Sequence, residues 1–412
     1  MHILLVADGR SPTTRRWILG LQAMQHRVTV VSTFPCEEIP GVEGMVTLPV
    51  AFGGMAGGQV TTRRATTGSG GRVRPLVSRF RGLFLRGRYG FGPISLAWYG
   101  PRFRRLAAEL QPDLVHGLRI PFEGMLAAYT PPGIPLVVSV WGNDLTLHAH
   151  GSRWMAEATR RTLRRADGLM ADAQRDTRLA RQWGFFPNRP SLVVPGSGGI
   201  DLAEMHRTRE EAEGSGMEYL PAGVPIVINP RGFRPGSVRN DVFFQAIPLV
   251  LQRSPKTVFV CPGMAGQPEA QRWVQRLKIG EHVRLLPFLT QGQLWDLFLR
   301  AAVTVSVSEH DGTPNTLLEA MALGCFPVVG DIESLREWIT PGVNGLLVEP
   351  AKPQSLAEAL AAALDRPGLR SSAAEINLRL IQQRAEANLV RSQVQVFYQR
   401  LFDAAQQQPS AA

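Results

Sequence analysis

The chain has 412 residues, of which 44% are hydrophobic and 19% are charged, and its formal net charge is +11. This composition excludes a largely disordered chain, and the length predicts two domains of roughly 200 residues each. The three cysteines, Cys36, Cys261 and Cys325, lack metal-ligand and disulfide spacings, which is typical of buried thiols in a reducing compartment. No signal peptide or membrane span is predicted, so we expect a cytoplasmic protein.

The positive charge is concentrated in the first half of the chain. Residues 1–200 contain 25 Arg and no Lys against 12 Asp and Glu, whereas the remaining residues contain 20 basic and 22 acidic side chains. Such an imbalance indicates a surface that meets something anionic, such as lipid headgroups, nucleic acid or an acidic substrate. A GC-rich genome would explain the preference for Arg over Lys, but it would not explain the unequal halves.

Short apolar runs alternate with longer helical patterns along the whole chain. The runs are 2–7, 27–32, 113–117, 135–140, 168–173 and 191–196 in the first half, and 225–229, 257–263, 283–288, 303–308, 326–330 and 345–350 in the second. Because most runs are continuously apolar, they predict parallel strands that helices cover on both faces. The pattern predicts an α/β protein with two doubly wound, Rossmann-like domains in series.

The polar segment 201–223 is the predicted junction between the domains. We expect an N-terminal domain over residues 1–205 and a C-terminal domain over residues 206–384. An amphipathic pattern near the end of the chain predicts a helix over about 385–405, which we expect to pack back onto the N-terminal domain.

The stretch SEHDGTPNTLLEAMALG, residues 308–324, places one acid on a turn and another in the helix that follows a strand. Thr313 is the predicted N-cap, Pro314 the first helical residue and Gly324 the residue that closes the helix. The backbone N–H groups at the start of this helix are then expected to be unpaired and to form a phosphate site, with Asn315, Thr316 and Leu317 as the donors.

Two interpretations of the acids in this stretch are open. In a phosphate site, Glu319 would accept hydrogen bonds from the hydroxyls of a ribose, and Asp311 would reach the other end of a nucleotide sugar. Alternatively, Asp311 closes a turn before Gly312, and Glu319 is an ordinary helix carboxylate that pairs with an arginine.

The stretch resembles the signature of the retaining GT-B glycosyltransferases of family 4, the glycosyl transferases group 1. Asp311-Gly312 stands where the family has Glu-Gly, and Glu319 follows eight residues later in LLEAMALG. Segments 193–201 and 331–350 are also similar to the family's sequence. The resemblance implies a GT-B fold with two domains facing a cleft, a contact of Asp311 with the transferred sugar and a contact of Glu319 with the ribose.

A loop over residues 229–246 supplies positive charge, which a departing nucleoside diphosphate needs. The resemblance implies that Arg231 and Arg239 hold the diphosphate, with Arg239 standing where a Lys is expected; a solvated charged loop is the alternative. The predicted catalytic residues are Asp311, Arg231 and Arg239. The predicted donor-binding residues are Arg231, Arg234, Arg239, Asp311, Gly312, Asn315, Thr316, Leu317 and Glu319.

The first domain is expected to bind the acceptor. Gly9 follows the first predicted strand, where the family has a Gly-rich turn, and His116 ends the run DLVHG. The stretch SVWGND resembles the family's H-G-x-D, with Trp141 at the His position and Asp144 retained. We therefore predict that Gly9, His116 and Asp144 lie at the acceptor or sugar, although a structural role would also explain each of them.

Metal ions and cofactors are not predicted. The chain contains no D-x-D triplet and no His, Asp or Glu cluster with metal-ligand spacing. The expected co-substrate is a nucleoside-diphosphate sugar. The sequence indicates no catalytic nucleophile, which agrees with the family's front-face retaining mechanism, because that mechanism needs none from the protein.

Three functions are open. The first is retaining transfer of a sugar to a glycan or lipid-linked acceptor, and the second is a sugar-nucleotide 2-epimerase, which needs no acceptor. The third is a non-catalytic protein that binds RNA or an anionic surface, because segment 75–98 interleaves basic and aromatic residues after a predicted loop over 51–75. We prefer contact with a membrane over RNA, since many family members use lipid-linked acceptors, and expect no nucleic acid. In that interpretation, Phe80, Phe84 and Leu85 would insert, while Arg79, Arg81, Arg86 and Arg88 would lie at the headgroups of the inner face.

Overall fold

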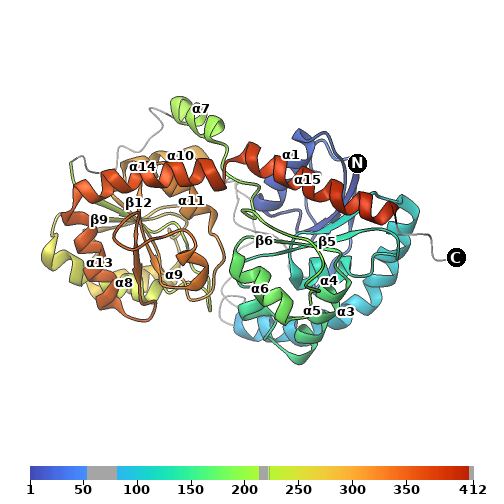
Figure 1. The fold of residues 1–412 in the computed structure, drawn as a ribbon. Coiled ribbons are helices and arrows are strands. Elements are labelled where there is room, and N and C mark those ends of the chain that lie inside the picture. The colour runs from blue at the N-terminus through green and yellow to red at the C-terminus, as the bar shows by residue number, and fades with distance from the viewer. Residues whose placement is uncertain (53–80, 213–220, 222, 408–412) are drawn as a thin grey trace. The chain divides into compact units, whose positions relative to one another are not determined.

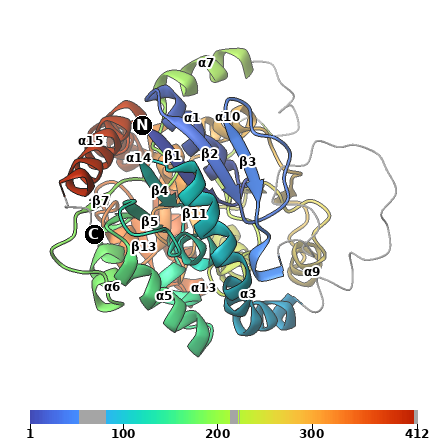
Figure 2. The same ribbon diagram turned by 90° about the vertical axis from the view of Figure 1, so that its right-hand side faces the viewer.

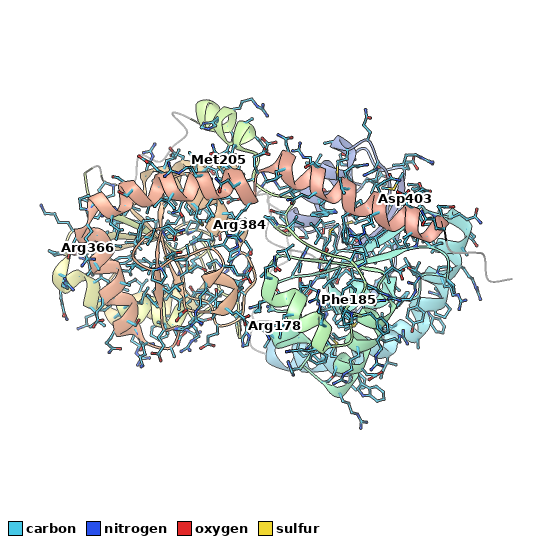
Figure 3. The ribbon with its side chains drawn as sticks, in the orientation of Figure 1. Arg178, Phe185, Met205, Arg366, Arg384 and Asp403 are labelled. Carbon is cyan, nitrogen blue, oxygen red and sulfur yellow. The ribbon has the colours of Figure 1, made fainter. Side chains whose placement is uncertain are left out.

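The computed structural model describes residues 1–52, 81–212, 221 and 223–407 (Figure 1). They form two compact units, the first from Met1–Gly198 with Val390 onward and the second from Gly199–Leu389. The chain thus divides after Gly198, earlier than the predicted limit at residue 205. The reason is that Ile200 N–H donates to the Ala385 carbonyl at 2.7 Å and Met205 packs in the core of the second unit (Figure 3).

In the described part of the first unit, seven parallel strands form one sheet in the order β3-β2-β1-β4-β5-β6-β7. Figure 2 shows β3, β2 and β1 in succession from one edge. The strands are β1 His2–Ala7, β2 Arg27–Ser32, β3 Gly44–Thr47, β4 Leu114–Gly117, β5 Leu136–Val140, β6 Gly168–Ala171 and β7 Ser191–Val193. The sequence did not predict β3, because its residues are only partly buried and carry no continuous apolar run.

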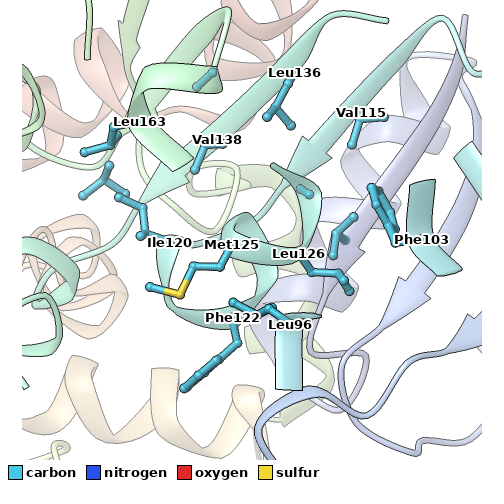
Figure 4. Close-up of a cluster of buried hydrophobic side chains, with 14 of the residues drawn as sticks. Leu96, Phe103, Val115, Ile120, Phe122, Met125, Leu126, Leu136, Val138 and Leu163 are labelled. Atoms are coloured by element: carbon cyan, nitrogen blue, oxygen red, sulfur yellow. The ribbon is translucent and has the colours of Figure 1, made fainter. Parts of the chain in front are cut away.

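Helices cover both faces of this first sheet. They are α1 Pro12–Ala23, α3 Arg81–Leu110, α4 Met125–Ala127, α5 Arg153–Arg165, α6 Gln174–Gln182 and α15 Ala387–Gln406, with short turns η1 Val50–Phe52, η2 Ile120–Gly124 and η3 Asp144–His148. Side chains of β1 alternate between the faces, so that Leu4 packs under α3 and α5 while Leu5 packs under α1 and α15 (Figure 4 shows the α3 side).

In the described part of the second unit, six parallel strands follow the order β10-β9-β8-β11-β12-β13. They are β8 Ile226–Ile228, β9 Val258–Cys261, β10 Val283–Leu285, β11 Val303–Ser306, β12 Phe326–Gly330 and β13 Leu346–Val348. The helices are α7 Leu202–Ala212, α8 Asn240–Arg253, α9 Pro268–Leu277, α10 Gln291–Arg300, α11 Asn315–Ala322, α12 Glu333–Arg336, α13 Pro353–Asp365 and α14 Pro367–Arg384. Figure 1 shows α10, α11 and α14 on one face and α8, α9 and α13 on the other.

Both sheets reverse their strand order once, which confirms the predicted α/β class with two doubly wound parallel sheets. The reversal lies between β1 and β4 in the first unit and between β8 and β11 in the second. In open α/β sheets, ligands bind at the carboxyl ends of the strands beside such a switch point. The two switch points are therefore the places to examine for a functional site.

Part of segment 51–98 lies outside the described residues. This applies to the predicted loop from residue 53 onward and to Arg79, Phe80 and the side chains of residues 81–86. Arg88 is described, and the expectation that it lies at lipid headgroups is wrong, because its guanidinium packs over the rings of Phe34 and Phe122 within the first unit. Among the described helices, none has the length and apolar character needed to cross a membrane.

Candidate functional site

Two loops meet at the switch point of the second unit, one after β8 and one after β11. Val238 and Ser308 form an isolated antiparallel bridge between them, and Arg239 N–H donates to the Val307 carbonyl at 2.8 Å. The Ser237 hydroxyl donates to the His310 carbonyl at 2.5 Å. These contacts join the predicted arginine loop to the predicted acidic turn.

The centre of this site is an ion pair between Arg231 and Asp311. Arg231 Nη2 donates to Asp311 Oδ2 at 2.5 Å, and the Arg231 side chain is only 5% exposed. The Ser308 hydroxyl donates to the same oxygen at 3.0 Å, and Gly312 N–H donates to Oδ1 at 3.1 Å. Since an ionised carboxylate accepts about four hydrogen bonds, these three donors hold Asp311 and leave room for about one more.

Positive charge exceeds negative charge around this pair. Arg231 Nε is buried and has no partner among the described residues. Arg234 lies nearby, and the Arg231 charge lowers the pKa of Arg234 to about 10, so Arg234 remains charged at neutral pH. Two guanidinium groups beside one carboxylate provide what an anionic ligand such as a diphosphate needs.

Arg239 has a different environment from the one that its predicted role requires. Its Nε and Nη2 donate to Asp241 at 2.9 and 2.8 Å, and its Nη1 donates to Glu309 at 2.5 Å. The hydrogen bonds to Asp241 and then Glu309 raise the pKa of Arg239 above its ordinary value. A contact of Arg239 with a diphosphate would require release of one of these carboxylates, so this role stays a prediction.

Helix α11 begins one residue later than predicted. Pro314, and not Thr313, is the residue that precedes the helix, and no side chain caps it there; the Thr313 hydroxyl accepts a hydrogen bond from Trp338 Nε1 at 3.0 Å. Leu317 N–H donates to the Pro314 carbonyl at 3.0 Å, so the expectation that Leu317 is an unpaired donor is wrong.

The start of α11 still offers polar groups. For the N–H groups of Asn315 and Thr316, no acceptor is found among the described residues, and the Thr316 hydroxyl is buried without a partner there. Glu319 lies one turn after Asn315 on the same helix and is 4% exposed. The helix therefore combines N–H donors at its positive end with a buried carboxylate one turn later.

Two supporting features were not predicted. Asn229, directly after β8, accepts from Arg231 N–H at 3.2 Å and donates to Asn240 at 2.9 Å, which braces the arginine loop. Gly330, at the end of β12, allows the backbone of Ser308 to approach, because a Cβ there would lie 2.5 Å from the Ser308 carbonyl oxygen. A polar residue immediately after an apolar strand, as at Asn229, was the signal in the sequence.

His116 lies in the core of the first unit, on β4. It is fully buried, its Nδ1 shares a hydrogen bond with the Tyr398 hydroxyl at 2.7 Å, and its Nε2 shares one with the Ser139 hydroxyl at 2.8 Å. Burial lowers the pKa of His116 to about 3, so the ring is neutral at physiological pH. Because both ring nitrogens are occupied, His116 anchors α15 to the sheet, and we do not carry its predicted acceptor contact into the proposed function.

Gly9 and Asp144 also have structural partners. A Cβ on Gly9 would lie 2.5 Å from Cys36 Sγ, so the glycine is required for packing after β1. Asp144 is fully buried and accepts hydrogen bonds from Arg119 Nη2 at 2.6 Å and from the Ile120 N–H at 3.1 Å. Both residues lie at the switch point of the first unit, but their side chains or backbone positions are explained by these contacts.

No group of His, Cys, Asp or Glu side chains that could hold a metal ion occurs in the described ranges. The candidate donor site thus consists of arginines, a helix terminus and two carboxylates on the second unit.

Comparison with known proteins assigns the chain to a fold class and a family. The two doubly wound units define a GT-B glycosyltransferase fold. The "Glycosyl transferase 4-like domain" matches residues 8–196, and "Glycosyl transferases group 1" matches residues 237–379. The chain belongs to the group 1 glycosyl transferases, which confirms the GT-B and group 1 parts of the resemblance found in the sequence.

Individual relatives are distant. A Bacillus subtilis protein named as a teichuronic acid biosynthesis glycosyltransferase, TuaC, is 26% identical over 70% of this chain and 73% of its own length. The D-inositol 3-phosphate glycosyltransferase of Nocardiopsis dassonvillei is 27% identical over 66% of this chain and 67% of its own length.

Solved structures share the fold at still lower identity. Sucrose-phosphate synthase from Thermosynechococcus elongatus has a TM-score of 0.70 at 16% identity, covering 98% of this chain and 100% of the other. HepE from Anabaena, in complex with UDP-glucose, has a TM-score of 0.65 at 17% identity, covering 96% and 98%.

Proposed function

We propose that the protein is a retaining glycosyltransferase that moves a sugar from a nucleoside-diphosphate sugar to an acceptor hydroxyl without a metal ion. The observation that carries this proposal is the buried ion pair of Arg231 and Asp311 at the switch point of the second unit. It combines a cation for a departing diphosphate with a carboxylate for a sugar hydroxyl. The likeness to HepE, whose structure holds UDP-glucose, supports a nucleotide sugar as the donor.

The donor lies along the carboxyl edge of the second sheet. Its diphosphate is bound by Arg231, Arg234 and the first N–H groups of α11. Its ribose hydroxyls donate to Glu319, one helical turn further on. Its sugar donates a hydroxyl to the lone pair that Asp311 has left after binding Arg231, Ser308 and Gly312.

The reaction exchanges one bond at the anomeric carbon. The bond to the terminal diphosphate oxygen breaks, a bond to the acceptor oxygen forms on the same face of the sugar, and the acceptor proton passes to the departing phosphate. Negative charge on the diphosphate grows as the first bond breaks. Arg231 therefore stabilises the transition state more than the bound donor, and its burial strengthens that effect.

Thermal unfolding of the purified protein with UDP, GDP, ADP and dTDP, and with their sugars, tests donor binding. A ligand at about 100 times its dissociation constant adds about 2.7 kcal/mol of stability, so a selective rise in Tm with one nucleotide is expected. The rise should be equal in EDTA and in Mg²⁺. A protein that none of these nucleotides stabilises contradicts the proposed donor site. Proton NMR of the first product then tests retention, and an inverted anomeric centre contradicts it.

We further propose that the acceptor is a glycan or lipid-linked saccharide and that the first unit contacts an anionic membrane. Phe91, Ile94 and Trp98 on α3 are 62%, 56% and 65% exposed and share one face of the helix. The guanidinium carbon of Arg102 lies 4.9 Å from the Trp98 ring. This α3 apolar face, with arginine beside it, has the chemistry of a helix that lies at a lipid interface.

Flotation with acidic liposomes tests the membrane contact. The double variant Phe91→Ser, Trp98→Ser should lose most of its binding, whereas Val396→Ser, at a 70% exposed position on α15, should not. Equal flotation of the double variant and the unmodified protein, or no flotation at all, would remove the membrane from the proposal.

A further inference from the structure

The switch point of the first unit holds a second cluster of charged side chains. The loops after β1, β2 and β4 bring Asp8, Thr33 and Glu123 to one edge of the sheet, and Arg88 reaches the cluster from α3. Two arginines here already have carboxylate partners. Arg10 makes two hydrogen bonds of 3.0 Å to Asp8, and Arg119 Nη2 donates to Asp144 at 2.6 Å.

Arg88 is the exception in this cluster. Its guanidinium carbon lies 5.3 Å from the centre of the Phe34 ring and 4.7 Å from that of Phe122. It makes no hydrogen bond or ion pair to any residue in the described part of the chain, and its Nε is buried. Burial lowers the pKa of Arg88, and the charges of Glu123 and Asp8 oppose this shift. Stacking on aromatic rings leaves the planar fork of the guanidinium open at its edge.

Glu123 is a buried carboxyl whose charge acts on Arg88, and no ion pair joins it to a residue in the described part of the chain. It is 3% exposed, its Oε1 accepts from the Thr33 hydroxyl at 2.9 Å, and its Oε2 has no partner among the described residues. It follows Phe122, whose φ of 70° and ψ of −46° are rare for a bulky residue and cost on the order of 1–3 kcal/mol. Such strain at a switch point is typical of a functional site. Figure 4 shows the Phe122 side chain beside the core of this unit.

The charges that face Glu123 come from three elements. They are Arg88 from α3, Arg119 from its own loop and Asp8 from the loop after β1. Burial raises the pKa of Glu123 to about 7, although both arginines oppose the rise. In its neutral form Glu123 leaves Arg88 without a counter-charge.

We propose that Arg88 and Glu123 form a subsite for one anionic group of the acceptor, a carboxylate or a phosphate. Arg88 donates two parallel hydrogen bonds from its fork to this group, and the protonated Oε2 of Glu123 donates a third. The assignment of the anion to the acceptor rests on the proposed function, which gives the donor to the second unit. The subsite itself stands on the contacts of the first unit.

Isothermal titration of the full chain with glucose, glucuronate and glucose 6-phosphate, at constant ionic strength, tests this subsite. At least one of the two anions should bind at least tenfold more tightly than glucose. If glucuronate binds more tightly, the group is a carboxylate, and if glucose 6-phosphate does, it is a phosphate. Anions that bind no more tightly than glucose would overturn the proposal.

Variants assign the binding to Arg88. Arg88→Gln should weaken binding of the anion at least tenfold. If that variant unfolds, Arg88→Lys, which keeps the positive charge between the rings, replaces it and should weaken binding several-fold. Arg105→Gln is the matched control, because Arg105 is exposed on the same helix. Unchanged affinity in both Arg88 variants would overturn the proposal.

Arg231→Gln separates this inference from the proposed donor site. It should keep the anion affinity while losing nucleoside-diphosphate affinity. If the anion is lost in Arg231→Gln and kept in the Arg88 variants, the anion binds at the donor site and the subsite is disproved. If no nucleotide binds but the Arg88-dependent anion remains, the donor proposal fails and the subsite stands.

The pH dependence tests Glu123. Glucuronate stays ionised between pH 6 and 8, so a change in its affinity reports on the protein. Affinity should fall several-fold as pH rises over this range, because ionised Glu123 competes for Arg88 and repels the ligand. Glu123→Gln should remove the fall, and an identical fall in that variant would exclude Glu123 from the subsite.

Discussion

Each switch point holds a carboxyl with little exposure to solvent, but the two carboxyls have different hydrogen-bond partners. In the second unit, Asp311 accepts hydrogen bonds from Arg231, Ser308 and Gly312. In the first unit, Glu123 accepts from Thr33 alone, and burial raises its pKa to about 7. The two carboxyls therefore differ in the number of hydrogen-bond donors that face them, and hydrogen bonds to a carboxylate favour its ionised form.

This difference between the two carboxyls agrees with the ligands that we propose for the two switch points, a nucleotide sugar in the second unit and an anionic acceptor in the first. A departing diphosphate needs positive charge, and the pKa of Arg234, about 10, keeps that guanidinium charged at physiological pH. A variable acceptor is better served by a carboxyl that can act as a hydrogen-bond donor or as a charge. Substitutions at either switch point test this comparison.

The largest effect is expected from Arg231→Ala. Turnover should fall about 100-fold or more, roughly 2.7 kcal/mol in the barrier, because the growing charge on the diphosphate loses its buried cation. Arg253→Ala, which removes an exposed pair with Asp365 at 3.3 Å, is the control and should turn over normally. Steady-state rates measure both, and normal turnover in Arg231→Ala would show that the donor site has been misplaced.

Glu123→Gln should change the pH dependence of stability by about 2 kcal/mol between pH 5 and pH 8. The pKa of Glu123 is about 7 in the folded chain and 4.5 ordinarily, so over this range the unfolded chain loses its proton first. The unmodified protein thus loses stability as pH rises, and the Gln variant does not.

Urea unfolding at both pH values measures this effect. Glu109→Gln, at an exposed position on α3, should follow the unmodified protein. If the stability of Glu123→Gln has the same pH dependence as that of the unmodified protein, the carboxyl of Glu123 does not titrate as proposed, and the two switch points do not differ in this way.

Glu319→Ala should weaken donor binding about tenfold, roughly 1.4 kcal/mol. The variant removes the buried carboxylate that we assign to the ribose, while the start of α11 and its N–H groups remain. Calorimetric titration with the nucleotide that stabilises the protein measures the change. Glu358→Ala, at an exposed position on α13, is the control, and equal affinities in the two variants would return Glu319 to a purely structural role.

The smallest effect is expected from Tyr398→Phe, about 1 kcal/mol of stability, because Nδ1 of His116 loses its partner. The loss should be the same at pH 5 and pH 8, since the pKa of His116 is about 3 and the ring stays neutral over this range. Thermal unfolding measures it, with Tyr99→Phe as the control. A loss that grows between pH 8 and pH 5 would show that His116 titrates, and would weaken its contrast with Glu123.

Much of the fold was predictable from local patterns. Continuous apolar runs predicted the strands of both parallel sheets, and among the strands that the structure describes only the partly buried edge strand β3 was missed. The signature around Asp311 and Glu319 predicted the family, because all of its residues lie in one continuous stretch of the chain, which forms a turn and the start of a helix. The same local reasoning placed Arg231 on the loop after β8.

Contacts between distant residues were not predictable in this way. Arg231 and Asp311 are 80 residues apart, and only the pairing of β8 with β11 brings them together. Thr313 was expected to cap α11, but Trp338, 25 residues later, takes its hydroxyl. Arg88 was expected at a lipid surface, and only the packing of α3 against the loops after β2 and β4 places it over Phe34 and Phe122.

The sequence by itself thus determined the two Rossmann-like units, the family and the loops that carry the candidate donor residues. The tertiary structure alone decided which of the buried polar groups are satisfied and which are left open. The physical reason is that strand and helix formation depend on neighbours in the chain, whereas the charge state and hydrogen bonds of His116 and Glu123 depend on burial and on partners that only folding supplies.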